Sequence, residues 1–425
     1  MSSILIKRAR IVNPRKNEDY IGDLFIEGER IALIGEDLFD YISKADQVID
    51  ADGLIAAPGL VDMHVHLRDP GQTEKEDIHS GCRAAAAGGV TSMLAMPNTY
   101  PVVDHKEMVQ YILDKAKTAD ANVYVAASIT KGLKGGEATD LDELSKGGAT
   151  AFSDDGRPVI DTKILLNALK KAREKDYLIT AHCEDLYIAA GGLMNEGETS
   201  ERLKLPGINR AAEDCGTARE IAAAAAVGAP IHICHVSTKG SVELIRDAKK
   251  RGLKVTAETA PHYLLLTDEL LEKRDADYKM NPPLRTEEDR LALIAALRDG
   301  TIDVIATDHA PHTPAEKSSF LRAPNGSIGL ETSLSAVLTA LDGVIGIMDI
   351  IRLMSCRPAE IMGIPAGSIA VGDNADIVLF DAEEHDTVDV NKLHGKSKNS
   401  PFKGMQLKGK VRYTLFRGRK VFENS

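Results

Sequence analysis

Two histidines separated by one residue, His64 and His66, end a short apolar run and could hold a metal ion. The run, Leu60–Val65, has the length of a buried β-strand. Side chains two residues apart on a strand lie on the same face, so both imidazoles can point at one ion. The spacing therefore indicates metal chemistry at the end of this strand.

Other ligand-type side chains also follow short apolar runs. They are Asp154 and Asp155 in the string Ser-Asp-Asp-Gly, His182, His235 and Asp308. Nitrogen and carboxylate ligands without thiolates suit zinc, or less selectively manganese or cobalt. With one of the adjacent pair Asp154 and Asp155 counted, four imidazoles and two carboxylates exceed what one tetrahedral ion can use, whereas two ions sharing a carboxylate and a hydroxide would use all of them. We therefore expect metal-assisted attack on an acyl carbon, with one or two Zn²⁺ ions per chain and two favoured.

Eight apolar runs recur along the middle of the chain and must position these side chains. They are residues 60–65, 91–95, 123–127, 149–152, 178–181, 231–234, 254–257 and 303–306. Helical stretches such as 80–89, 102–117, 161–175 and 241–252 separate many of them. Alternating strand and helix predicts an α/β fold, a (β/α)8 TIM-type barrel over residues 58–364, whose active site lies at the carboxyl ends of the strands. An open doubly wound sheet is the alternative.

The two ends of the chain have a different pattern of apolar and polar residues from its middle. Residues 1–57 and 365–425 contain short alternating runs separated by Asn, Gly and Asp turns, which is typical of antiparallel strands. We expect both ends to form one small, discontinuous β-sandwich domain.

Composition excludes several classes of function. The chain has 425 residues, 52 Lys and Arg against 64 Asp and Glu, and a net charge of −12 without a basic run. This charge argues against nucleic acid or an anionic membrane surface as a partner. Five scattered cysteines without a close pair indicate a reducing compartment, and neither a signal peptide nor a membrane span is apparent. We therefore expect a cytoplasmic enzyme with a small-molecule substrate.

Several longer strings give a more specific indication. In order they are GLVDMHVHLRDPG from Gly59, MPNT from Met96, NPPLR from Asn281, TDHAPH from Thr307 and GLET from Gly329. With these strings the whole chain resembles the dihydroorotases, bacterial class I type, of the amidohydrolase superfamily. The His-x-His pair alone indicates only the superfamily, whereas the ordered strings are much more specific.

The resemblance implies reversible cyclisation of N-carbamoyl-L-aspartate to dihydroorotate plus water, a step of de novo pyrimidine biosynthesis. It implies that His64, His66 and Asp308 hold one ion and that His182 and His235 hold the other. Many relatives bridge the ions with a carboxylated lysine, but this chain has Asp155 there, and a bridge of different reach implies looser binding of one ion. Asp154 is the competing candidate, since alternate residues face opposite ways. Asp308 is the expected general acid and base of a metal-activated hydroxide mechanism.

The substrate is a small anion and needs a local cation. Arg68, two residues beyond His66, offers a planar fork for a carboxylate. By resemblance, Arg68 binds the α-carboxylate together with Asn98 and His312, while Asn281 and the backbone near Asn325 and Gly326 read the ring amides.

Some assignments stay open at this level. The polar segment 313–324 is either a loop that closes over substrate or an inert surface loop. We expect His232 to be a packed core histidine, and Cys183 and Cys234 to be small buried side chains on the face opposite the ligand histidines.

Proteins related to the dihydroorotases have other functions, which are the alternatives for this chain. Another cyclic amidase, a hydantoinase, dihydropyrimidinase or allantoinase, is the nearest rival, followed by a non-catalytic dihydroorotase-like scaffold subunit. A homodimer and an association with aspartate transcarbamoylase are further expectations from the resemblance.

Overall fold

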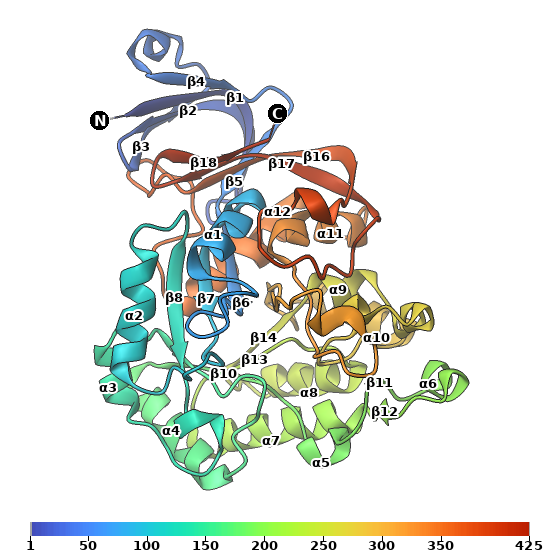
Figure 1. Ribbon diagram of the computed structural model, residues 1–425. Coiled ribbons are helices and arrows are strands. Elements are labelled where there is room, and N and C mark those ends of the chain that lie inside the picture. The colour runs from blue at the N-terminus through green and yellow to red at the C-terminus, as the bar shows by residue number, and fades with distance from the viewer. Residues whose placement is uncertain (1, 425) are drawn as a thin grey trace.

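Eight parallel strands form the central barrel of the computed structural model, which describes residues 2–424 (Figure 1). They are β6 Leu60–Val65, β7 Val90–Ala95, β8 Asn122–Ala127, β9 Ala151–Phe152, β10 Leu178–Ala181, β13 Ile231–Ile233, β14 Val255–Thr259 and β15 Val304–Ile305. Neighbouring strands follow chain order. A parallel bridge from Val65 to His309, with His66 N–H donating to the His309 carbonyl at 2.8 Å, joins the first strand to the segment after the last. The eight predicted strands are confirmed, and the sheet closes into a barrel instead of remaining open.

Helices follow the barrel strands and surround them (Figure 1). They are α1 Ile78–Ala87, α2 Lys106–Ala116, α3 Leu141–Lys146, α4 Thr162–Lys175, α5 Leu186–Ala189, α6 Glu198–Leu203, α7 Ala211–Val227, α8 Lys239–Lys250, α9 Pro261–Leu265, α10 Glu287–Arg298, α11 Ser333–Ala340, α12 Ile347–Ile351 and α13 Arg357–Met362. The start of α1 shows why such helices begin where they do: the Asp77 carboxylate accepts from Ser80 N–H, and the Ser80 hydroxyl accepts from Asp77 N–H. A short parallel pair, β11 Met194–Asn195 and β12 Gly207–Ile208, is inserted before α7.

The two chain ends meet in a second eight-stranded sheet, seen at the top of Figure 1. Its strands are β1 Ser3–Asn13, β2 Glu18–Glu27, β3 Arg30–Gly35, β4 Gln47–Asp50, β5 Ile55–Pro58, β16 Ile377–Thr387, β17 Gln406–Phe416 and β18 Arg419–Glu423. Antiparallel pairing of β5 with β16 joins the N-terminal strands to the C-terminal ones. Strand β1 pairs with β4 before Arg8 and with β5 after it. On its other edge, the pairing of β1 with β2 shifts register at Arg8, which has φ +59°. The sheet encloses an apolar core of its own, built from both ends.

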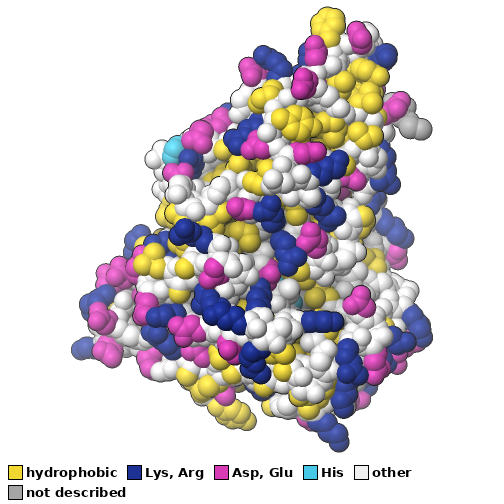
Figure 2. All heavy atoms as spheres, turned by 180° about the vertical axis from the view of Figure 1, so that it is seen from behind, with side chains coloured by type: hydrophobic (Ala, Val, Ile, Leu, Met, Phe, Trp, Pro, Cys, Tyr) yellow, Lys and Arg dark blue, Asp and Glu magenta, His cyan; other side chains and the backbone are white. Residues whose placement is uncertain are grey.

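Gly59 connects the two sheets at a point where only glycine fits. It lies between β5 and β6, and a Cβ atom there would be 2.2 Å from Thr91 Oγ1. On the face shown in Figure 2, acidic and basic side chains are interspersed. None of the helices within residues 2–424 has the length and apolar character needed to cross a membrane.

Candidate metal centre and substrate cavity

One cavity of about 250 Å³ gathers every predicted site residue except His64. It is lined by His66, Arg68, Asn98, Asp155, Gly156, His182, His235, Asn281, Asp308, Ala310, His312, Asn325 and Gly326. These residues come from segments far apart in sequence that follow the carboxyl ends of different barrel strands. The closed barrel brings those ends to one face, which is why the predicted side chains converge.

Asp155 lies among the four histidines. Its Oδ1 is 3.2 Å from His64 Nε2, 3.6 Å from His235 Nε2 and 3.8 Å from His182 Nδ1. Its Oδ2 is 3.6 Å from His66 Nε2. One carboxylate oxygen therefore faces three of the histidines, and the other faces His66.

Asp308 completes the group that contains the His-x-His pair. Its Oδ1 lies 3.0 Å from His66 Nε2 and 3.7 Å from His64 Nε2. Ligand atoms of His64, His66 and Asp308 all lie within 4.8 Å of one another, as do those of His64, Asp155 and His235. On the other side, His182 Nδ1 is 2.9 Å from His235 Nε2. The side chains thus form two neighbouring groups that share His64.

The donor set fits divalent metal ions. His64 Nε2 and Asp155 Oδ1 are buried, and neither has a hydrogen-bond partner of acceptable geometry among residues 2–424. Buried polar atoms without partners are costly unless another group satisfies them. Imidazole nitrogens and carboxylate oxygens facing one another at 3 to 4 Å leave a place for such an ion.

Asp154 is directed away from this cluster. Its Oδ1 accepts from the N–H groups of Ile129 and Thr130 at 2.8 and 3.0 Å, and its Oδ2 accepts from the Thr130 hydroxyl. Both carboxylate oxygens are thus used within the loop after β8. Of the two candidates, only Asp155 faces the histidines.

The histidines control the charge of both carboxylates in the cluster. Burial alone raises the pKa of a carboxyl group, but His64, His235 and His66 hold the pKa of Asp155 well below its usual range. The pKa of Asp308 is also lowered, because His66 and His64 outweigh the effect of its burial.

Backbone strain marks three residues of the site. Arg68, His235 and Asp308 have φ values of +59°, +35° and +48°, which side-chain-bearing residues rarely adopt. Such conformations persist when neighbouring contacts hold them. For Asp308, the buried Asp62 carboxylate does this: it accepts from Thr307 N–H at 3.1 Å and from the Thr307 hydroxyl at 2.6 Å.

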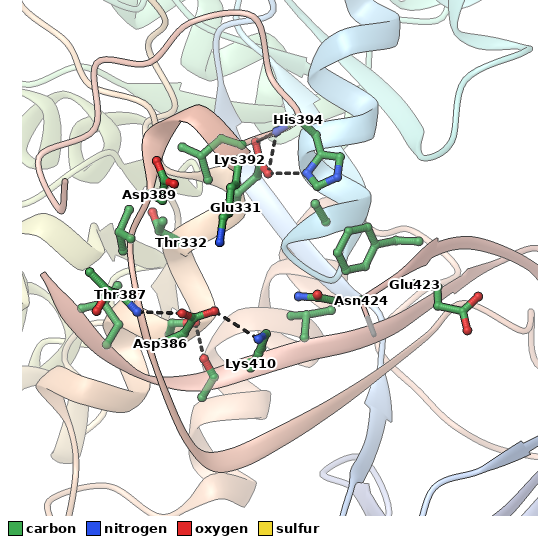
Figure 3. A pocket seen from close by; sticks show the side chains of 18 residues that line it. Glu331, Thr332, Asp386, Thr387, Asp389, Lys392, His394, Lys410, Glu423 and Asn424 are labelled. Carbon is green, nitrogen blue, oxygen red and sulfur yellow. Dashed lines mark hydrogen bonds and ion pairs between the residues drawn. The ribbon is translucent and has the colours of Figure 1, made fainter. Parts of the chain in front are cut away.

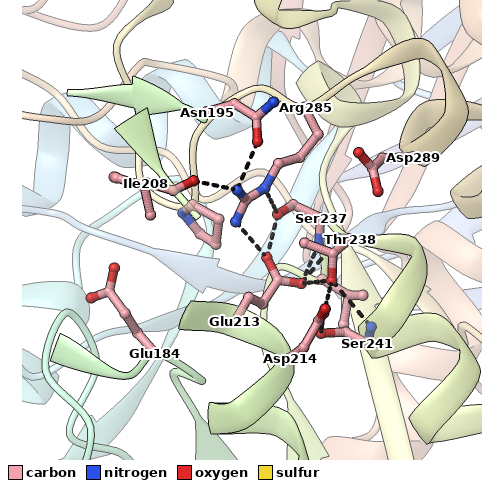
Figure 4. A network of polar contacts seen from close by, with 12 residues as sticks. Glu184, Asn195, Ile208, Glu213, Asp214, Ser237, Thr238, Ser241, Arg285 and Asp289 are labelled. Carbon is pink, nitrogen blue, oxygen red and sulfur yellow. Dashed lines mark hydrogen bonds and ion pairs between the residues drawn. The ribbon is translucent and has the colours of Figure 1, made fainter. Parts of the chain in front are cut away.

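A buried polar network holds the segment after His235 (Figure 4). Glu213, at the start of α7, accepts from the N–H groups of Ser237 and Thr238 at 2.9 and 3.0 Å. Arg285 lies 3.4 Å from Glu213 and donates to the Ser237 hydroxyl at 3.1 Å. The same guanidinium donates to Asn195 Oδ1 at 3.0 Å, which ties the β11–β12 insertion to this turn. Neither Glu213 nor Arg285 was identified as a site residue from the sequence, although Arg285 belongs to the NPPLR string.

The arginine that lines the cavity is Arg68. Arg68 Nε donates to the Pro311 carbonyl at 3.1 Å, and burial lowers the pKa of Arg68 to about 10, so it stays charged at neutral pH. His312 Nε2 donates to the Asn325 carbonyl at 2.8 Å. Burial, together with the charges of Arg68 and Lys317, lowers the pKa of His312 to about 3 and keeps this ring neutral.

Close packing against Ala310 and His312 requires a glycine at position 326. Gly326 has φ +130°, and a Cβ atom there would lie 2.7 Å from Ala310 Cβ and 3.0 Å from His312 Nε2. The family resemblance had implied only that the backbone near this glycine contacts the substrate.

Asn98 and Asn281 contact the cluster through different partners. Asn98 Oδ1 is 2.7 Å from His66 Nδ1, and its amide lies 3.4 Å from Asp155 Oδ2. Asn281 donates to Glu184 Oε1 at 3.2 Å, while Glu184 Oε2 is 3.3 Å from His182 Nε2. Glu184 was not predicted, although its place two residues after His182 could have indicated it.

The expectation that Cys234 faces away from the ligand histidines is wrong. Cys183 and Cys234 are buried, as predicted, but Cys234 Sγ lies within 4.8 Å of ligand-type atoms of His64 and Glu258. The positive φ of His235 ends the regular alternation of the strand, so consecutive side chains both reach the region of His64. His232 is fully buried, as predicted, and contacts Thr256 and Glu258.

Two lysines hold the segment 313–324 in place. Lys317 Nζ donates to the carbonyls of Pro324, Ala276 and Lys279 at 2.9, 3.0 and 3.2 Å. Lys279 Nζ donates to the Ala323 carbonyl at 2.8 Å. The loop is therefore anchored to the wall next to Asn325 and Gly326.

A second cavity, of about 400 Å³, lies between α11 and the ends of β16 and β17 (Figure 3). Its charged side chains contact one another or nearby groups: Lys410 pairs with Asp386 at 3.1 Å, and Glu331 accepts from His394 Nδ1 at 2.9 Å. It shares no residue with the metal-ligand cavity.

Known proteins resemble this chain over its full length. A family model described as dihydro-orotase-like matches residues 53–241. The dihydroorotase of Geobacter metallireducens is 46% identical, covering 99% of this chain and 100% of the relative. That of Trichlorobacter lovleyi is 48% identical, covering 99% of each chain. Among solved structures, the L-hydantoinase (dihydropyrimidinase) of Arthrobacter aurescens has a TM-score of 0.88 at 25% identity, covering 100% of this chain and 96% of that one.

The two kinds of similarity agree with the site. The structural likeness is to cyclic amidases with the same barrel, and the higher sequence identity is to proteins named dihydroorotase across the whole chain. The cavity gathers histidines and carboxylates that could hold metal ions. The chain belongs to the dihydroorotase family of the amidohydrolase superfamily.

Proposed function

We propose that this protein interconverts dihydroorotate plus water and N-carbamoyl-L-aspartate, the dihydroorotase step of pyrimidine biosynthesis. The observation that carries the proposal is the lining of one cavity by both the His and Asp cluster and Arg68. The substrate carries carboxylates, and Arg68 has a half-buried, charged guanidinium that can pair with one of them.

The metal assignment is part of this proposal. His64, His66 and Asp308 would hold one Zn²⁺ ion, His182 and His235 a second, and Asp155 would contact both. Zinc there would polarise the substrate carbonyl and lower the pKa of water, which makes a nucleophile available near neutral pH.

The chain's own residues supply binding and proton transfer. Arg68 would bind the α-carboxylate, with Asn98 and His312 beside it, and Asn281, Asn325 and Gly326 would contact the ring amides. In hydrolysis, Asp308 accepts a proton from the attacking water and transfers it to the ring nitrogen as the C–N bond breaks. In cyclisation, Asp308 removes a proton from the carbamoyl nitrogen, which attacks the side-chain carboxyl carbon, and water leaves.

Turnover of dihydroorotate by the purified full-length chain, supplied with zinc, tests this function. We expect His64→Ala and Asp308→Asn to abolish hydrolysis, while His105→Ala, at an exposed position, leaves it unchanged. Turnover of hydantoin or allantoin with none of dihydroorotate would assign the protein to a rival cyclic amidase. Lack of turnover of all three substrates would favour a scaffold role. Zinc analysis of the same sample tests two ions against one.

Further parts of the proposal rest on resemblance and composition. We place the domain boundaries at residues 1–57 with 365–425 and at 58–364, which is supported by the separate apolar core of the end sheet. A homodimer and an association with aspartate transcarbamoylase rest on resemblance alone. A cytoplasmic location is supported by five cysteines that are all free.

A further inference from the structure

Glu258, on the seventh barrel strand, lies between two buried histidines. Its side chain is 1% exposed. Its Oε1 is 2.8 Å from His64 Nδ1, and its Oε2 is 3.1 Å from His232 Nε2. His232 Nδ1 is in turn 2.9 Å from the Thr256 hydroxyl. Hydrogen bonds thus connect the half-buried Thr256 through the buried His232 and Glu258 to His64, a proposed metal ligand.

The direction of each hydrogen bond follows from the chemistry of a carboxylate. An ionised Glu258 can only accept, so His64 donates from Nδ1 and His232 donates from Nε2. His232 Nδ1 then accepts from the Thr256 hydroxyl. Both oxygens of Glu258 are thus used by imidazole N–H groups.

This arrangement determines which nitrogen of His64 is available. With the proton held on Nδ1, the lone pair is on Nε2, which is 3.2 Å from Asp155 Oδ1 and 3.7 Å from Asp308 Oδ1. That nitrogen is buried and has no hydrogen-bond partner of acceptable geometry in the described chain. A carboxylate on the far nitrogen of a ligating imidazole fixes the ring orientation and raises its basicity.

We propose that Glu258 is a positioning residue that holds His64 in the tautomer and orientation needed for metal binding, and that His232 holds Glu258 in place. The inference rests on the metal role proposed for His64. It assigns a function to the seventh strand, which contributes no predicted ligand.

Glu258→Gln tests the inference with almost no change in shape. The amide keeps one acceptor but turns the other oxygen into a donor, which then faces an imidazole N–H. Thr256→Val is the matched control, because it removes only the hydrogen bond to His232, which is the one farthest from His64. We expect Glu258→Gln to weaken zinc binding about 10- to 100-fold in chelator competition, and Thr256→Val to change it by less than about threefold.

Two further measurements separate positioning from folding. Thermal unfolding of the metal-free proteins shows whether Glu258→Gln is folded. In zinc-loaded wild-type protein labelled with ¹⁵N-histidine, with signals assigned through His64→Gln, we expect the His64 proton on Nδ1 and the metal on Nε2. This second measurement needs no Glu258 variant to fold.

The outcomes distinguish this inference from the proposed function. Wild-type protein that neither binds zinc nor turns over dihydroorotate would contradict the proposed function. If the wild type does both, then equal zinc affinity of a folded Glu258→Gln variant, or a His64 proton on Nε2, overturns only the role of Glu258.

Discussion

Asp155 Oδ1 lies 3.2 Å from His64 Nε2, and neither buried atom has a hydrogen-bond partner of acceptable geometry among residues 2–424. The adjacent residue, Asp154, has both oxygens engaged by Ile129 and Thr130. Two neighbouring aspartates of the same string therefore have opposite environments, and substitutions at the two positions should have different effects.

Asp155→Asn should reduce metal binding, while Asp154→Asn should reduce stability. Loss of the Asp155 charge removes the carboxylate shared by the histidines, so we expect kcat/KM to fall by about 100-fold or more and bound zinc to decrease. Asp154→Asn replaces an acceptor by a donor facing N–H or O–H groups and should cost about 1–3 kcal/mol of unfolding free energy. Zinc analysis and urea denaturation check both variants. Equal zinc loss in both would contradict the assignment of Asp155.

Arg68→Lys should weaken substrate binding although it keeps the positive charge. A lysine ammonium cannot form the paired hydrogen bonds of a guanidinium with a carboxylate. We expect KM for dihydroorotate to rise about tenfold or more with a smaller change in kcat. Arg83→Lys, at an exposed position of α1, is the control and should leave both constants unchanged. An unchanged KM for Arg68→Lys would show that this side chain does not bind the substrate.

Arg285→Met should destabilise the fold through the network of Figure 4. The substitution leaves the buried Glu213 carboxylate without its cation, which costs about 3–5 kcal/mol of unfolding free energy. Adding Glu213→Gln should recover part of that loss, because it removes the unpaired charge. Arg246→Met, which breaks the more exposed pair with Asp299, should cost less than about 1 kcal/mol. Similar losses at Arg285 and Arg246, measured by urea denaturation, would argue against a buried pair.

Protonation of Asp77 in acid should lower the stability of the metal-free protein. Burial opposes it, but Lys396 and the Ser80 N–H lower the pKa of Asp77 to about 2 from its ordinary value of 3.8. Its stabilising contribution is therefore complete above about pH 4 and disappears as the pH falls through about 2. We expect the difference in unfolding free energy between wild type and Asp77→Asn to be about 1 kcal/mol near neutral pH, after allowance for solvent screening, and to vanish near pH 2.

A control for this pH dependence is Asp114→Asn, which affects only the exposed pair with Lys117. Its difference from wild type should stay near zero at every pH. A difference for Asp77→Asn that does not change between pH 5 and 2 would contradict the lowered pKa.

The sequence by itself determined the parallel strands and their covering helices, whereas the tertiary structure decided that these strands close into a barrel instead of forming an open sheet. Eight apolar runs at regular spacing can bury their side chains only as parallel strands under helices, and all eight are strands in the structure. Because parallel strands share one carboxyl edge, ligand-type residues after those runs had to converge, as His182, His235 and Asp308 do. Local pattern was sufficient for these residues.

Only the tertiary structure decided contacts that local pattern does not encode. Asp154 and Asp155 are adjacent residues of the same type. The loop after β8 distinguishes them, because its N–H groups bind the Asp154 carboxylate and leave Asp155 facing the histidines. His235 departs from strand alternation because it adopts a positive φ, which no neighbouring glycine or proline signalled. Glu258 and Glu213 act on residues distant in sequence, through hydrogen bonds that exist only once the barrel has closed. Spacing along the chain predicted which residues meet at the carboxyl ends of the strands, but the hydrogen-bond partners of those residues are set by packing between strands.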